Sequence, residues 1–78
     1  MSKRASTPTD AEIDSMAIAH LAGMITTVTG VHDNDAVATQ AAELFRTSPA
    51  VQYAALCYGA KALNDAQFRA IVTGAVAQ

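Results

Sequence analysis

The feature that most constrains this sequence is a long stretch without charge. No Asp, Glu, Lys or Arg occurs from Ser15 to His32, a run of 18 residues. In and just before this run, mostly apolar residues recur at spacings of three and four, which is the period of a helix with one apolar face. These residues are Ile13, Met16, Ala17, His20, Leu21, Met24 and Val28, flanked by Ile18 and Ile25. A helix without a charged face is normally covered on more than one side, so we expect neighbours around it.

The remaining sequence also has the period of helices, and no segment alternates as a strand would. Pro49 suits the first position of a helix, and the preceding Ser48 ends the helix before it. We therefore predict an all-α fold, a compact bundle of four short helices in a single domain spanning 9–78, preceded by a flexible leader at 1–8. The predicted helices span 10–28, 35–46, 49–63 and 65–76.

Short capping sequences support the predicted helix starts. Thr9 and Glu12 have the spacing of a capping box, in which each side chain bonds the backbone N–H of the other residue. Asn64 and Gln67 have the same spacing before the last predicted helix. Asp33 or Asn34 is the expected cap of the second helix. The boundary between the third and fourth helices is the least defined, and the two could form one bent helix.

Alanine contributes 18 of the 78 residues, which leaves few large side chains for a core. Alanine favours helix but buries little apolar area, and small domains with a thin core often gain stability by association. We therefore expect self-association, as a homodimer or a larger assembly. Small residues four apart, which let helices approach closely, are consistent with this, although they also arise by chance in such a sequence. These pairs are Ala19/Gly23, Ala55/Gly59 and Ala70/Gly74.

Composition also limits the partners and the compartment. The net charge is −2 and no basic patch is present, so a nucleic-acid partner is not expected. A single Cys excludes a disulfide scaffold, and no apolar segment follows Lys3 and Arg4 as it would in a secretion signal. His20 and several Ser and Thr residues interrupt the uncharged run, so we expect no membrane span. These observations predict a small acidic protein of the cytoplasm.

The function that this pattern predicts is a small non-catalytic protein–protein interaction module. It would act as an adaptor, an inhibitor or an assembly subunit, of the kind found in phages and mobile elements, by burying an uncharged helical surface. Tyrosine is enriched at interfaces, so the two tyrosines of the third helix are included among the expected contact residues. The predicted contact residues are Ile18, Leu21, Ile25, Tyr53 and Tyr58.

A DNA-binding regulator is the alternative interpretation. Residues 41–56 have the outline of a helix-turn-helix, with small, apolar and capping residues in suitable positions. Phe45 stands where the turn glycine is expected, and Arg46 stands where an apolar residue is expected, which weakens the match. The chain has only five Lys and Arg residues to contact phosphates. In this alternative the contacts would come from Arg46, Ser48, Gln52, Tyr53 and Lys61.

A small enzyme is a more distant third possibility, with Cys57 as nucleophile and His20 or His32 as base. No helix start or neighbouring cation lies near Cys57 in the sequence to lower its pKa, so we expect a buried structural cysteine. The segment 32–35 is rich in oxygen ligands but does not match a calcium loop, because the twelfth position of a loop that begins at Asp33 is Leu44 rather than Glu. We therefore predict no catalytic residue, no metal and no cofactor.

Overall fold

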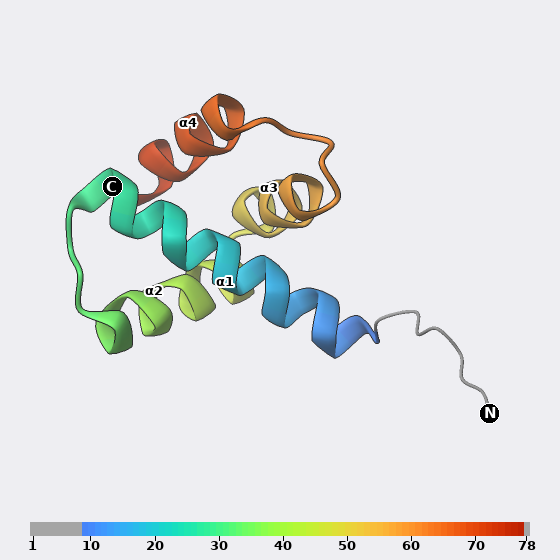
Figure 1. Cartoon of the computed structure of the whole chain (residues 1–78), viewed down its shortest axis with the longest axis horizontal. Coiled ribbons are helices and arrows are strands. Elements are labelled where there is room, and N and C mark those ends of the chain that lie inside the picture. The colour runs from blue at the N-terminus through green and yellow to red at the C-terminus, as the bar shows by residue number, and fades with distance from the viewer. Residues whose placement is uncertain (1–8, 78) are drawn as a thin grey trace.

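Residues 9–77 are described by the computed structural model, and they fold into four helices without a strand among them (Figure 1). The predicted leader at 1–8 lies outside the described residues. α1 packs against each of the other three helices, and α3 also contacts α2 and α4. The all-α prediction with four helices is confirmed. The helices are α1 (Asp10–Thr29), α2 (Asn34–Thr47), α3 (Pro49–Gly59) and α4 (Asp65–Val76).

Two capping boxes fix the starts of α1 and α4, as the sequence predicts. At α1, the Glu12 N–H donates to Thr9 Oγ1 at 3.1 Å and the Thr9 N–H donates to Glu12 Oε1 at 2.8 Å. At α4, Asn64 and Gln67 bond each other in the same way at 2.8 and 3.0 Å. Each box provides acceptors for backbone N–H groups that have no partner within the helix.

The end of α3 differs from the prediction. The helix ends at Gly59 rather than at residue 63, so α3 and α4 are two separate helices. The Lys61 N–H donates to the Tyr58 carbonyl and the Ala62 N–H donates to the Cys57 carbonyl, at 3.0 and 2.7 Å, which is the pattern of a Schellman motif. The left-handed position of this motif normally holds glycine, but here it holds Lys61 with a φ of 64°. The nearest glycine, Gly59, is the last residue of the helix and stands two positions before the left-handed residue.

The core is small and rich in alanine, as the composition suggests. Four of its eleven buried residues are alanines, and no buried polar or charged residue occurs within 9–77. Phe45 and Phe68, the two phenylalanines of the chain, are both buried in this core. None of the helices in the described range is long and apolar enough to cross a membrane. The buried residues are Ala17, Leu21, Ile25, Val37, Ala41, Phe45, Val51, Ala54, Ala55, Phe68 and Val72.

Candidate functional site

The structure separates the five predicted contact residues. Leu21 and Ile25 are 0% exposed and belong to the core, so they have no surface to offer a partner. Ile18 and Tyr58 are half-buried against that core, whereas Tyr53 is 72% exposed. The expectation that Leu21 and Ile25 contact a partner therefore needs correction. The uncharged face of α1 on which they lie is covered by the other helices of the same chain.

The exposed apolar part of α1 lies instead at its start. Every residue from Asp10 to Met16 is exposed, and the first buried residue of the helix is Ala17. We call residues 10–16 the α1 arm, because this blue segment extends past the other helices in Figure 1. The arm carries two large apolar side chains in water, Ile13 at 40% and Met16 at 57% exposure.

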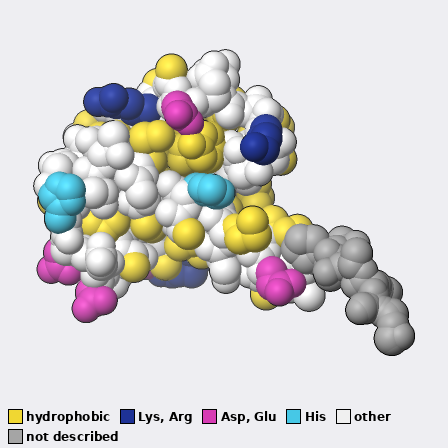
Figure 2. All heavy atoms as spheres, viewed as in Figure 1, with side chains coloured by type: hydrophobic (Ala, Val, Ile, Leu, Met, Phe, Trp, Pro, Cys, Tyr) yellow, Lys and Arg dark blue, Asp and Glu magenta, His cyan; other side chains and the backbone are white. Residues whose placement is uncertain are grey.

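An apolar groove begins at the base of the arm. It has a volume of about 220 Å³ and lies between α1 and the end of α3. Figure 2 shows hydrophobic side chains gathered where the start of α1 leaves the bundle. We call this hollow the α1–α3 groove; its lining residues are Ile13, Met16, Ala17, Ala55, Leu56, Gly59 and Ala60.

Tyr53 lies on the same face of α3 as two of the groove residues. Tyr53, Leu56 and Ala60 are three and four positions apart, a spacing that places side chains on one side of a helix. Hydrogen bonding with Cys57, one turn along α3, raises the pKa of the Tyr53 hydroxyl above its usual value. Tyr53 is therefore the one predicted contact residue that is both strongly exposed and next to this apolar surface.

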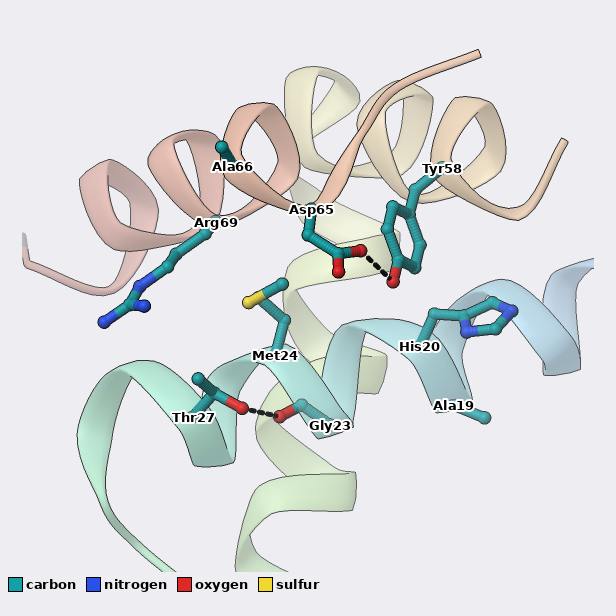
Figure 3. A pocket seen from close by; sticks show the side chains of 9 residues that line it. All are labelled: Ala19, His20, Gly23, Met24, Thr27, Tyr58, Asp65, Ala66 and Arg69. Atoms are coloured by element: carbon teal, nitrogen blue, oxygen red, sulfur yellow. Dashed lines mark hydrogen bonds between the residues drawn. The ribbon is translucent and has the colours of Figure 1, made fainter. Parts of the chain in front are cut away.

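A polar cluster lies between α1 and α4 (Figure 3). The Tyr58 hydroxyl donates to Asp65 Oδ1 at 2.6 Å, and this hydrogen bond raises the pKa of Tyr58. The Tyr58 ring stacks on Phe68 at 4.5 Å and meets the ring of His20 edge-on at 5.3 Å. The Arg69 side chain lines the same cavity of about 660 Å³. The cluster is not visible in the sequence because its members come from three helices, α1, α3 and α4, whose packing brings them together.

A second cavity of about 700 Å³ adjoins the first and shares His20, Tyr58 and Asp65 with it. Lys61 lines this second cavity, as Arg69 lines the first. These are two of the three Lys and Arg residues within 9–77. Most of the positive charge of the described chain therefore lies along this side, around His20.

The residues of the DNA-binding alternative do not form one basic surface. Arg46 forms an ion pair with Glu43 on α2, whereas Lys61 follows the far end of α3. The helix between them has 11 residues and contains no Lys or Arg. Ser48 Oγ accepts the Val51 N–H at 3.3 Å, so this side chain caps α3. Gln52 is exposed on the same helix.

The residues considered for metal binding or catalysis do not come together in one site, and Asp33 serves as a helix cap. No group of three or more His, Cys, Asp and Glu side chains that could hold a metal occurs within the described residues. Asp33 caps α2 by accepting the Ala36 N–H at 3.1 Å, as the sequence predicts. Cys57 is a free, half-buried thiol on α3.

A comparison with family models, curated proteins and solved structures found no match for this chain. Its function is therefore inferred from its own surfaces. Among the described residues, we consider two regions: the apolar arm and groove, and the polar cluster around Tyr58. Of these, the arm and groove expose the larger apolar side chains.

Proposed function

We propose that this chain is a non-catalytic protein–protein interaction module that binds through the α1 arm and the α1–α3 groove. The observation that carries the proposal is the exposure of Ile13 and Met16 beside an apolar hollow. Burial of a large apolar side chain contributes about 1.5–3 kcal/mol. A partner that covers both side chains gains a substantial part of its binding free energy at these two positions.

The shape and chemistry of the surface fit a helix of another polypeptide. The groove residues contributed by α3 and its C-cap are mostly alanine and glycine, and their small side chains let a second helix approach closely. Met16 is flexible and adapts to the shape of an apolar partner. Asp10, Glu12 and Asp14 surround the apolar side chains with negative charge, which orients a partner without adding much affinity.

This surface suits an adaptor, an inhibitor or an assembly subunit, and self-association is the simplest form of such binding. The DNA-binding alternative receives less support, since α3 lacks Lys and Arg and Arg46 is already paired with Glu43. Phosphate contacts, which supply most non-specific affinity for DNA, depend on those residue types.

Site-specific photo-crosslinking tests the proposal. A crosslinking amino acid is placed at position 16 in the full chain, and in a control chain at position 31, where Val31 is also exposed, at 45%. We expect a protein adduct from position 16 that disappears when Ile13→Asp is added, and no such adduct from position 31. Equal adducts from both positions, or none from position 16, would contradict the proposed surface.

A further inference from the structure

The arm and the groove are parts of one self-complementary surface. The arm projects from the bundle, and the groove beside it is hollow, with Ile13 and Met16 belonging to both. A two-fold symmetric interface requires the same surface to serve both copies. When the arm of one copy enters the groove of the other, the reverse contact forms at the same time.

The groove has room for a side chain from the arm of a second copy, and it lets the backbone of that arm approach α3 closely. Its volume is about 220 Å³, and an engineered cavity of about 150 Å³ already holds benzene. A methyl group placed on Gly59 would meet only His20 Cδ2 within 4 Å, at 3.7 Å. Ala55, Gly59 and Ala60 therefore leave space above α3 for the large apolar side chains of a second arm.

Charges lie at the two opposite ends of this surface. At the free end, Asp10 is three residues before Ile13 and seven before Ala17, so all three share one face of α1. At the bundle end, Lys61 directly follows the groove residue Ala60, and both Lys61 and His20 line the adjoining cavity. Parallel arms would bring the acidic first turns together. Antiparallel arms bring Asp10 of one copy to Lys61 and His20 of the other.

The apolar and the charged contacts are compatible with the same symmetry axis. Residues 10 and 20 of α1 are separated by about 15 Å along the helix. An axis midway between them crosses α1 at the level of Ser15, which lies between Ile13 and Met16 in the sequence. We propose, resting on the proposed function, that the partner is a second copy of this chain, whose α1 arm packs antiparallel in the α1–α3 groove with Asp10 against Lys61 and His20.

Sedimentation equilibrium of the full chain tests the apolar half of this proposal. We expect a monomer–dimer equilibrium that Met16→Asp weakens at least about tenfold, because a central apolar contact is lost and a charge is left in its place. Val31→Asp, which adds the same charge at an exposed apolar position outside the groove, should leave the dissociation constant unchanged. Circular dichroism confirms that both variants keep their helices.

A charge exchange tests the antiparallel register. Lys61→Glu and Asp10→Lys should each weaken the dimer about fivefold, and the double variant should restore it. Lys61→Gly provides a second variant that suits the φ of 64° at this position, and it should also weaken the dimer. All three single effects should shrink in 1 M salt, where charges more than about 3 Å apart are screened. A double variant as weak as the single ones would overturn the register.

The outcomes separate this inference from the proposed function. A chain that stays monomeric but forms adducts with another protein from position 16 overturns the inference and supports the function. A dimer that depends on Met16 but not on the charge exchange also overturns the inference alone. A dimer insensitive to Met16→Asp overturns the inference alone as well. A crosslink from position 16 to residues 1–8 of the same chain, or a monomer without adducts, overturns both.

Discussion

The two parts of α1 differ in what covers their apolar residues. From Ala17 to Thr29 the helix carries no charge, and its large side chains Leu21 and Ile25 are fully buried by the other helices. The arm at 10–16 carries three carboxylates, yet its apolar residues Ile13 and Met16 remain exposed. Within 17–29 it is therefore the large apolar residues that are buried in the monomer, while small and polar residues such as Ala19, His20 and Gly23 are exposed. The exposed Ile13 and Met16 of the arm are the apolar residues to which the proposed function assigns a partner.

The largest expected effect comes from truncating the covered part of α1. Leu21→Ala should lower the free energy of unfolding by about 2–5 kcal/mol, since it leaves a cavity in a core that has few large side chains. This is a large share of the roughly 4–12 kcal/mol expected for a domain of this size. Met16→Ala in the arm should change it by less than about 0.5 kcal/mol when the protein is dilute. Urea unfolding followed by circular dichroism measures both.

Similar losses for the two variants would contradict the contrast between the parts of α1. Ile13→Ala is a second arm variant for the same comparison, because Ile13 is also exposed. A large destabilisation in either arm variant would mean that the arm packs within the monomer, and the proposed binding surface would then be wrong.

The fold was predictable where its signals are local. Thr9 with Glu12, and Asn64 with Gln67, are close in sequence, so their capping boxes and helix starts follow from residue spacing alone. The end of α3 did not follow, because Lys61 takes the left-handed conformation that usually requires glycine. Local sequence gives no indication that tertiary packing of α3 and α4 compensates the cost of that conformation.

The candidate site was less predictable than the fold. Periodicity identified the apolar stripe of α1, but it did not show where along the helix the other three helices stop covering it. That boundary, between Met16 and Ala17, depends on the lengths and crossing of α2, α3 and α4. The contact of His20 with Tyr58, and of Tyr58 with Asp65, likewise depends on how three helices meet.

A smaller effect is expected from removing the cap of the arm. Thr9→Ala deletes the acceptor for the Glu12 N–H, and loss of such a cap costs about 1 kcal/mol. Because the arm has no buried side chain, this loss should promote fraying of the arm rather than unfolding of the bundle. Hydrogen exchange should become about fivefold faster for the amides of residues 13–16 and stay unchanged at Leu21.

Asn64→Ala is the matched control, because Asn64 forms the same capping box at the start of α4. That helix holds the buried Phe68 in its first turns, so this variant should lower the global free energy of unfolding by about 1 kcal/mol. If Thr9→Ala accelerated hydrogen exchange in the core as much as in the arm, the arm would not be an independent segment.

The smallest expected effect is the response of the polar cluster to alkaline pH. The hydrogen bond to Asp65 raises the pKa of Tyr58 in the folded state above its usual 10.0. A raised pKa means that the stabilising contribution is complete below pH 10 and is lost as the pH rises through the folded-state value. Tyr58→Phe removes this contribution, so its stability should fall less steeply above pH 10 than that of the parent.

The parent and the Tyr58→Phe variant should both also carry Tyr53→Phe. Cys57 raises the pKa of Tyr53 as well, so Tyr53 would otherwise add its own loss of stability above pH 10. Urea midpoints measured at several pH values below and above 10 then report Tyr58 alone. The cluster joins the bundle part of α1 to α3 and α4 through His20, Tyr58 and Asp65, and it includes no arm residue. At protein concentrations where the chain is monomeric, the alkaline slope should therefore be unaffected by Met16→Asp. Equal slopes with and without Tyr58→Phe would show that the Tyr58–Asp65 bond does not stabilise the covered part of α1.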